Sequence, residues 1–455
     1  MTERSLTPSV AAPIMPPMSD PMVELRARIE DRRAVVGVAG LGYVGLPLAI
    51  EFARAGFEVV GVDPDPERVA AVNAGRSYVG DVRSEDVESA RRAGRVTAHG
   101  SWEVVSSLDA IVVCVPTPFD ANREPDLSFV RAATEEIGRR LRPGQLVVLE
   151  STTYPGTTEE VVRPVLERQG LRAGRDFALA YSPERVDPGN REYQVGNTPK
   201  LVGGATPQCT ALAAALYEKA VIKVVPVSSP RVAEMAKLLE NIFRNVNIAL
   251  VNELAMLCDR MGINVWEVVE AAATKPFGFM SFQPGPGVGG HCIPVDPVYL
   301  AWKAKEYDFY TNFIMRAAEV NANMPYFVVQ KLLRLLASKG SRVLGARVLV
   351  LGVTFKRNVA DVRNSPALKI LELLQDHGIE AAYHDPLISR LDLRGSPIGS
   401  MPLTAEVLQG AECAVLHTDH ACFDYDWIVE HARLVFDTRN ATRGVKAGRE
   451  KVVRL

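Results

Sequence analysis

The chain has 455 residues, of which 47% are apolar and 23% charged, and its 52 basic and 54 acidic residues nearly cancel. This length exceeds one ordinary core, so we expect two or three globular domains. A net charge of −2 gives no electrostatic reason to bind nucleic acid. No apolar run approaches the roughly 20 residues of a membrane-spanning helix, so no membrane segment is expected.

Residues 1–23 have the composition of a disordered tail, with five prolines among scattered Ser, Thr and Met. They lack the basic start and the apolar run of a signal peptide. The six cysteines form no CxxC pair, and their spacing fits neither a zinc site nor a disulfide framework. We therefore expect a reduced, cytoplasmic protein without a bound metal.

A dinucleotide-binding turn is the first motif. Residues 34–39 predict a buried strand, Gly40-Leu-Gly42-Tyr-Val-Gly45 follows, and a helical pattern runs over 45–55. The next strand, 58–62, ends in Asp63, which stands 18 positions after Gly45. A GxGxxG turn between a strand and a helix, with an acidic residue at this distance, indicates a dinucleotide site. A glycine-rich turn without a ligand is the alternative.

Each residue of this motif has a physical task. Gly40 makes the tight turn, Gly42 lets a pyrophosphate approach, and Gly45 lets the helix pack on the strand. Asp63 is expected to bind the ribose hydroxyls and to repel a 2′-phosphate, which favours NAD over NADP. Arg68 is a candidate neighbour of the adenine, with an ordinary solvated helix residue as the alternative.

Two later strands end in threonines. The apolar runs 109–115 and 145–150 predict strands, and Thr117 and Thr152 follow them. Ligands lie at the carboxyl ends of strands in open parallel sheets. Both threonines are therefore candidate ligand contacts, and capping of the next helix is the alternative.

The C-terminal part repeats this order. Strands are predicted over 347–351, 380–384, 414–417 and 434–436, with a helix over 365–377. The first of these strands is followed by the single glycine Gly352, and the loop up to Ser365 carries Lys356 and Arg363. A second doubly wound domain is expected, and the cations favour a phosphate-bearing ligand.

A long helix is predicted between the two halves, over 232–261. Lys237, Asn241 and Asn245 share one of its faces, and Asn252 follows. Buried polar groups need partners, and hydrogen bonding across a dimer interface is one way to supply them. A second helix is expected over about 312–336, which Pro325 would kink or divide.

Residues 284–296 hold the most informative segment. Four glycines stand in the seven positions before Cys292, and three prolines stiffen the run. Glycines let backbone amides come close to a ligand, so we expect a rigid cradle with one thiol at its end.

These groups together indicate oxidation through a covalent intermediate. A thiol adds to an aldehyde, hydride transfer to NAD leaves a thioester, and water releases an acid. A lysine or an amide stabilises the developing negative charge, and a carboxylate positions or deprotonates the water. Asp296 and Glu184 are the candidates for the carboxylate.

The same residues identify a family. The GlyLeuGlyTyrValGly turn, SerThr…ProGlyThr, SerProGluArg, Lys237…Asn241, GlyGlyHisCys…Asp and Phe355-Lys-Arg-Asn…Asp361-Val-Arg-Asn-Ser-Pro366 occur in one order. From about residue 34 to the C-terminus the chain resembles the nucleotide-sugar 6-dehydrogenases, the UDP-glucose/UDP-N-acetylhexosamine dehydrogenase group. The resemblance implies oxidation of C6 of a UDP-sugar to a carboxylate with two NAD⁺.

The resemblance also implies an α/β fold of two doubly wound Rossmann-like domains joined by a central helical dimerisation region. The expected divisions are an NAD-binding domain (24–227), a helical domain with the cysteine loop (228–338) and a UDP-sugar-binding domain (339–455). The expected partners are a UDP-sugar and a second copy of the chain, in a homodimer or higher homo-oligomer.

Carried over by position, Cys292 is implied to be the nucleophile. Lys237 and Asn241 are implied to hold the C6 oxygen, and Thr152 and Asp296 to order the water. Glu184 is implied to be a second acid/base. The implied substrate-binding residues are Glu184, Arg185, Val186, Lys237, Asn241, Phe282, Gly285, Gly289, Phe355 and Lys356. The implied cofactor-binding residues are Gly40, Gly42, Tyr43, Val44, Gly45, Asp63, Arg68, Thr117, Thr152 and Arg363.

The sugar is indicated by fewer residues. His291, Thr153-Tyr154 and Ile293-Pro-Val resemble the UDP-N-acetylglucosamine/galactosamine branch more than the UDP-glucose branch. UDP-glucose and UDP-N-acetylmannosamine stay open as substrates. Pro276 stands where UDP-glucose members often present an arginine across the dimer, and whether Lys275 or Arg316 replaces it is open.

Other classes of protein fit the sequence less well. Nucleotide-sugar epimerases and dehydratases use a Tyr-x-x-x-Lys pair in a helix after the third strand, which this chain lacks. A non-catalytic nucleotide-sugar sensor on the same scaffold would be expected to have lost Cys292 or Lys237, and both are present.

Overall fold

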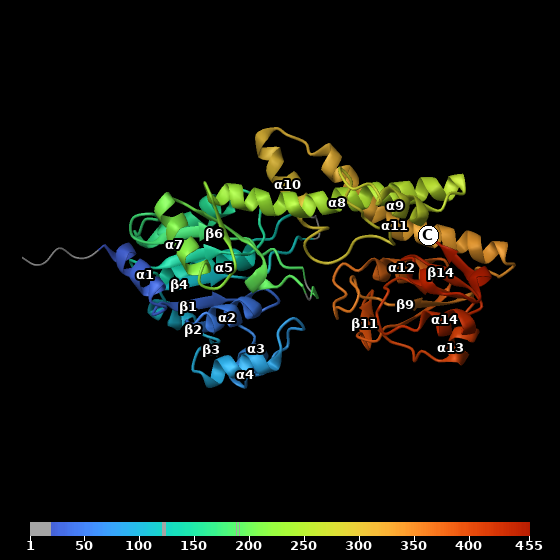
Figure 1. Ribbon diagram of the computed structural model, residues 1–455, viewed down its shortest axis with the longest axis horizontal. Coiled ribbons are helices and arrows are strands. Elements are labelled where there is room, and N and C mark those ends of the chain that lie inside the picture. Colours follow the sequence, from blue (N-terminus) through green and yellow to red (C-terminus); the bar gives the residue numbers. More distant parts are fainter. Residues whose placement is uncertain (1–19, 121–123, 188, 191) are drawn as a thin grey trace, which may run out of the picture.

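The computed structural model describes residues 20–455 apart from 121–123, 188 and 191. Two sheets lie towards opposite ends of the molecule, and the long helix α8 (Pro230–Met261) runs from one to the other (Figure 1). This arrangement confirms the predicted α/β fold with two Rossmann-like halves and a helical centre.

The predicted disordered tail covers residues 1–23, of which 1–19 lie outside the described residues. The prediction is wrong for the last three residues of the tail, which are helical. Residues 21–23 form the first turn of helix α1 (Pro21–Glu30). The Asp20 side chain accepts a hydrogen bond from the Met22 amide at 2.9 Å, and Met22 is buried in the first core. An N-cap aspartate followed by proline is a helix start, which the compositional argument missed.

The first sheet has eight strands in the order β3-β2-β1-β4-β5-β6-β7-β8, and every neighbouring pair is parallel except β6 and β7. Its strands are β1 (Val35–Ala39), β2 (Glu58–Val62), β3 (Val96–His99), β4 (Ala110–Val113), β5 (Leu146–Leu149), β6 (Ala178–Tyr181), β7 (Lys200–Gly204) and β8 (Val224–Val227). The strand order reverses between β1 and β4, which opens a crevice at their carboxyl ends.

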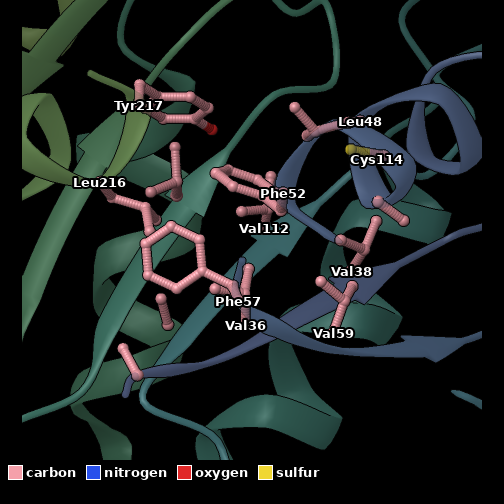
Figure 2. Close-up of a cluster of buried hydrophobic side chains, with 14 of the residues drawn as sticks. Val36, Val38, Leu48, Phe52, Phe57, Val59, Val112, Cys114, Leu216 and Tyr217 are labelled. Carbon is pink, nitrogen blue, oxygen red and sulfur yellow. The ribbon is translucent and has the colours of Figure 1, made fainter. Parts of the chain in front are cut away.

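Helices cover both faces of this sheet. They are α2 (Gly45–Arg54), α3 (Pro66–Asn73), α4 (Ser84–Arg92), α5 (Ser128–Arg140), α6 (Arg163–Leu166) and α7 (Pro207–Tyr217), together with α1. The central strands are buried on both faces, as expected for near-continuous apolar runs. Figure 2 shows one of the resulting cores, in which Phe52 and Tyr217 pack with their rings 5.6 Å apart.

The centre of the chain is helical. It holds α8, α9 (Val265–Ala272), α10 (Asp296–Ala304) and α11 (Asn312–Ser338). Ser229 caps α8 through a hydrogen bond from the Val232 amide, and Gly262 ends it with φ +70°. α11 runs unbroken through the buried Pro325, so the expected division at that residue does not occur.

The second sheet is parallel throughout, in the order β10-β9-β13-β14-β15. Its strands are β9 (Arg347–Leu351), β10 (Glu380–His384), β13 (Cys413–Leu416), β14 (Val435–Asp437) and β15 (Val452–Arg454), and β11 (Arg390–Leu393) pairs separately with β12 (Ser396–Gly399). The remaining helices are α12 (Pro366–Asp376), α13 (Ala405–Gly410) and α14 (Tyr425–His431). One face of this sheet shares a core with α8, α9 and α11, so the central helices belong to its packing.

Candidate active site

The glycine turn after β1 has three glycines with different surroundings. A Cβ on Gly40, which has φ +91°, would lie 2.6 Å from the Cys114 carbonyl oxygen, and one on Gly45 would lie 1.8 Å from the Gly40 carbonyl oxygen. A Cβ on Gly42 would meet nothing within 4 Å. Two glycines therefore serve close backbone packing, whereas Gly42 leaves open space beside the turn, as a dinucleotide pyrophosphate requires.

Asp63, at the end of β2, supports this turn. Its side chain is buried, and Oδ2 accepts a hydrogen bond from the Leu41 amide at 2.7 Å. Arg68 Nη1 lies 3.4 Å from the same oxygen. The carboxylate thus stays at the crevice beside the turn, where it fits an adenosine ribose and repels a 2′-phosphate. The residues present fit NAD.

Cys292 lies in the loop before α10, and α8 holds that loop. Asn241 Nδ2 donates to Asp296 Oδ2 at 2.6 Å, and Asn245 Nδ2 donates to the Ile293 carbonyl at 3.2 Å. The Asp296 amide donates to the Cys292 carbonyl at 2.9 Å, which closes one turn between the thiol and the carboxylate. Asn241 and Asn245 therefore both donate within the chain, while Asn245 Oδ1 is buried without a partner.

Burial sets the protonation of this cluster. Burial raises the pKa of Asp296 to about 6, although the charge of Lys237 and the hydrogen bond from Asn241 oppose the rise. Burial and the Asp296 charge raise the pKa of the Cys292 thiol to about 11. The thiol is thus protonated at neutral pH, and an attack by sulfur needs a proton acceptor close by.

Glu184 lies in the loop after β6. Its Oε1 accepts hydrogen bonds from the Arg185 and Val186 amides, both at 2.7 Å. Arg185 in turn pairs with Glu240 of α8 at 2.7 Å. These contacts fix the loop that carries the carboxylate against the same helix that holds the cysteine loop.

The loop between β9 and α12 reaches the first half of the chain. The Arg363 guanidinium carbon lies 5.3 Å from the centre of the Tyr43 ring, within the glycine turn. The Gly290 amide donates to the Arg363 carbonyl at 3.0 Å, beside Cys292. Lys356 Nζ pairs with Asp187 at 2.7 Å. One loop therefore touches the dinucleotide turn, the cysteine loop and the loop after β6.

These groups surround one cavity of about 1380 Å³. That volume exceeds the range of pockets for a single small ligand, so it has room for a cofactor and a substrate. The predicted site residues that line it are Gly40, Gly42, Tyr43, Val44, Asp63, Arg68, Thr117, Thr152, Glu184, Arg185, Val186, Lys237, Asn241, Gly289, Cys292, Asp296, Phe355 and Arg363.

Four predicted residues do not line this cavity: Gly45, Phe282, Gly285 and Lys356. Gly45 packs beneath the turn. Phe282 packs against Phe243 of α8 at 5.9 Å between ring centres, and the Gly285 amide donates to Asn252 at 2.9 Å.

The glycines before Cys292 differ from the expectation of an open cradle. A Cβ on Gly289 would lie 2.7 Å from the Phe355 Cβ, and one on Gly290 would lie 3.0 Å from the Phe355 ring. A Cβ on Gly287 would lie 3.0 Å from Pro366. These glycines therefore let the cysteine loop pack against the loop after β9. They determine how the two halves meet at the thiol.

Sequence reasoning missed three charged residues around the site. Lys200 and Glu150 form a buried pair at 3.1 Å behind Glu184, and the Arg439 guanidinium would lie 2.7 Å from a Cβ on Gly285. A charged residue at the edge of a buried apolar strand was the available signal for the first two. Nothing local marks Arg439, which follows β14.

A dinucleotide turn with its acidic residue opens onto the same cavity as a thiol flanked by a lysine and carboxylates. This combination defines the class as an NAD-dependent dehydrogenase.

The sequence matches the UDP-glucose/GDP-mannose dehydrogenase family in three successive parts. They are its NAD-binding domain at residues 34–221, its central domain at 231–323 and its UDP-binding domain at 349–444. The chain belongs to this family of nucleotide-sugar dehydrogenases, and NAD is its cofactor.

The relatives act on several sugars. UDP-N-acetyl-D-glucosamine 6-dehydrogenase of Pseudomonas aeruginosa is 41% identical over 359 residues, covering 78% of this chain and 84% of that protein. UDP-N-acetyl-D-mannosamine dehydrogenase of Pyrococcus horikoshii is 35% identical over 424 residues, covering 91% and 97%. The solved structure of UDP-D-ManNAc dehydrogenase from Pyrococcus horikoshii superposes with a TM-score of 0.84 at 32% identity, covering 92% and 98%.

A UDP-glucose dehydrogenase structure from Pyrobaculum islandicum has a similar fold, with a TM-score of 0.82 at 27% identity, covering 97% of this chain and 98% of that one. The fold is thus shared by enzymes named for different sugars. Among the residues that the structure describes, no helix combines the length and the apolar character needed to span a bilayer.

The second and third glycines of the turn, Gly42 and Gly45, should respond differently to alanine. Gly45→Ala should destabilise the fold, because its Cβ would overlap the Gly40 carbonyl and overpacking costs about 1–3 kcal/mol. Gly42→Ala should change the free energy of unfolding by less than about 0.5 kcal/mol, yet weaken NAD binding. Urea unfolding and calorimetric NAD titration measure the two effects. Equal destabilisation, or wild-type NAD affinity in Gly42→Ala, would contradict the assignment.

Proposed function

We propose that the chain is a UDP-N-acetyl-D-glucosamine 6-dehydrogenase. It oxidises the C6 alcohol of the sugar to a carboxylate and consumes two NAD⁺ and one water. The observation that carries this proposal is the cluster of Cys292, Asp296, Asn241 and Lys237 at one cavity with the dinucleotide turn. A simple alcohol dehydrogenase has no need for the thiol. The product is a building block for surface polysaccharides or glycoconjugates.

Cys292 acts once the C6 carbon is an aldehyde. Its sulfur bonds to C6 and forms a thiohemiacetal, and oxidation leaves a thioester that water cleaves to the acid and the free thiol. NAD, when bound, accepts a hydride in each of the two oxidations. The sulfur must lose its proton to attack, and Asp296, one turn away, is the carboxylate whose charge acts most strongly on the thiol, with a pKa of about 6.

Lys237 and Asn241 hold the C6 oxygen. Lys237 is buried on α8 beside Asp296, so its positive charge acts at low dielectric where negative charge develops on that oxygen. Asp296 and Thr152 order the water that cleaves the thioester. Glu184 is the second acid/base of the reaction.

The remaining contacts divide between substrate and cofactor. Arg185, Val186, Gly289 and Phe355 line the sugar side of the cavity, and Arg363 contacts the NAD phosphates beside Tyr43. Phe282, Gly285 and Lys356 lie outside the cavity lining, and their proposed role is to bind the UDP part. The proposed division is NAD in 24–227, the cysteine loop in 228–338 and UDP in 339–455.

The preference for an N-acetylated sugar is supported by His291. Its Nδ1 is buried without a hydrogen-bond partner, and the residue lines the cavity beside Cys292. Burial and the charge of Arg363 lower the pKa of His291, so the ring is neutral at pH 7 and can bond an amide. Thr153 and Tyr154 act only indirectly, because both are buried and neither lines the cavity.

UDP-N-acetylmannosamine is the second candidate substrate. It differs from UDP-N-acetylglucosamine only in the orientation of the acetamido group at C2. The relative from Pyrococcus horikoshii named for that sugar aligns over 91% of this chain. His291 would serve either sugar, so turnover has to distinguish them.

The reaction is tested by NADH production with UDP-glucose, UDP-N-acetylglucosamine, UDP-N-acetylgalactosamine and UDP-N-acetylmannosamine. UDP-N-acetylglucosamine should give the highest kcat/KM and two NADH per sugar. Cys292→Ala should lose net acid formation by about 10⁴-fold or more while it still binds NAD, because the thioester cannot form. Full turnover by Cys292→Ala would reject the covalent mechanism. A higher kcat/KM with another of the four sugars would show that UDP-N-acetylglucosamine is not the preferred substrate.

His291→Ser should shift this preference. Loss of one hydrogen bond between neutral groups costs about 1 kcal/mol, so kcat/KM for UDP-N-acetylglucosamine should fall about fivefold relative to that for UDP-glucose. The same variant should keep its NAD affinity. An equal loss with both sugars would show that His291 does not contact the acetamido group.

We also propose that the chain forms a homodimer in which α8 packs against α8 of the second copy. Exposed apolar side chains recur at spacings of three, four and seven along one side of the helix: Val232, Met235, Leu239, Phe243, Leu250, Leu254, Leu257 and Met261. A stripe of this length on a monomer is unusual, and a second copy of the same helix would cover it. Lys275 and Arg316 lie outside the cavity lining of their own chain.

The dimer is tested by two charged substitutions on α8. Leu239→Glu with Leu254→Glu should yield a monomer by light scattering after gel filtration, because it would bury like charges at a two-fold interface. Arg260→Glu on the same helix, outside the stripe, is the control and should stay dimeric. A wild-type monomer, or dimeric Leu239→Glu/Leu254→Glu, would rule out this interface.

A further inference from the structure

A buried lysine stands between two carboxylates behind the cavity. Lys200 opens β7, Glu150 follows β5 and Glu184 follows β6. Because β7 runs antiparallel to β6, its first residue lies at the carboxyl ends of β5 and β6, where ligands bind. The single antiparallel pair in this sheet thus brings a cation to the rim of the site.

The contacts of Lys200 are confined to the protein interior. Its side chain is 4% exposed and does not line the cavity. Nζ lies 3.1 Å from Glu150 Oε2, 3.4 Å from Glu184 Oε2 and 3.3 Å from the Pro183 carbonyl. A lysine in such a place needs a negative partner, and two carboxylates share this one.

The two carboxylates differ in what else they contact. Glu150 receives a hydrogen bond from the Tyr217 hydroxyl, and that ring also lies 5.2 Å below Lys200 Nζ. Figure 2 shows the Tyr217 hydroxyl at the edge of the core around Phe52. Both carboxylates line the cavity, but Glu184 receives two backbone amides and its side chain is 14% exposed, whereas that of Glu150 is 0% exposed. Glu150 is therefore anchored in the core, and Glu184 is the one available to a ligand.

We propose that Lys200 is a positioning residue for the reaction: it holds Glu184 ionised and in place at the cavity wall, while Glu150 competes for the same ammonium group. This rests on the proposed function only in giving Glu184 an acid/base role.

The protonation of the carboxylates agrees with this division. Burial raises the pKa of Glu150 to about 7, against the charge of Lys200. Burial acts in the same sense on Glu184, but Lys200 and the Val186 amide outweigh it and leave the pKa of Glu184 lowered. Near neutral pH Glu150 is therefore the carboxylate that takes up a proton. Glu184 then remains ionised and is the one charged partner of the Lys200 ammonium group within this trio. The other titratable and charged groups that face this pair are Cys114, Arg185, Tyr217, Lys237 and Glu240.

Lys200→Met removes the cation but leaves Glu150 buried and unpaired, so it tests folding as well as position. Lys200→Met/Glu150→Gln also removes the unpaired charge. Its stability in urea should be near that of wild type, since a buried pair replaced by neutral groups is often harmless. Glu184 should nevertheless titrate at higher pH, and kcat should fall about 100-fold with little change in KM for NAD.

Glu150→Gln alone is the opposite control, because Lys200 then pairs with Glu184 without a competitor. It should keep kcat within about twofold, and Glu184 should titrate no higher than in wild type. Lys331→Met is the matched control, because it also replaces a paired lysine by methionine. It breaks the half-buried pair of Lys331 with Asp259 at 2.6 Å, which lies far along α11, and it should leave kcat unaltered.

Titration of Glu184 is read by ¹³C NMR of carboxyl-labelled glutamate, assigned with Glu184→Gln, and needs no turnover. If wild type oxidises no UDP-sugar, the proposed function fails, yet the titration still tests Lys200. A double variant in which Glu184 titrates as in wild type, or whose kcat is restored along with its stability, would overturn the proposal. A Lys200→Met kcat loss that only parallels unfolding, with Glu184 unmoved, would do the same.

Discussion

The polar edge of α8 is the constraint on which this site depends. Four side chains of one helix hold three segments: Glu234 accepts from the Gly156 and Thr158 amides, Asn241 and Asn245 donate to Asp296 and to the Ile293 carbonyl beside Cys292, and Asn252 accepts from the Gly285 amide. Lys237 lies between the first two. Because a buried polar group without its partner costs about 1–3 kcal/mol, no loop can move alone without leaving part of the helix unsatisfied. The helix thus fixes the thiol relative to the strand ends of the first sheet.

The burial that makes these bonds strong also limits the chemistry. It raises the pKa of the Cys292 thiol to about 11 and that of Asp296 to about 6, so the resting pair is a neutral thiol beside a weakly basic carboxylate. Lys237 is the nearby charge that favours both anions. A thiol held protonated is less open to adventitious oxidation, which follows the thiolate. A thiolate at Cys292 therefore needs a proton acceptor close by.

The sequence predicted what is local and missed what depends on topology. The glycine turn, the long helix and the strands β1, β2, β4, β5, β9, β10, β13 and β14 were predicted, because each has its periodicity and its start and stop residues in a short window. The short strands β3, β6, β7, β8, β11, β12 and β15 were not predicted. The pairing of Lys200 with Glu150 was not, because it joins residues 50 positions apart through a strand that runs antiparallel where the pattern predicted a parallel sheet. The glycines before Cys292 were recognised as necessary, but their reason lies in Phe355, which comes from the other half of the chain.

That contact explains how a second domain can act on a thiol it does not carry. The loop after β9 bonds the cysteine loop through the Gly290 amide, lies on the Tyr43 ring through Arg363, and pairs Lys356 with Asp187 beside Glu184. An anionic ligand that binds Lys356 must compete with Asp187 for that ammonium group. The second domain therefore touches the loop that carries Glu184 through the ion pair of Lys356 with Asp187.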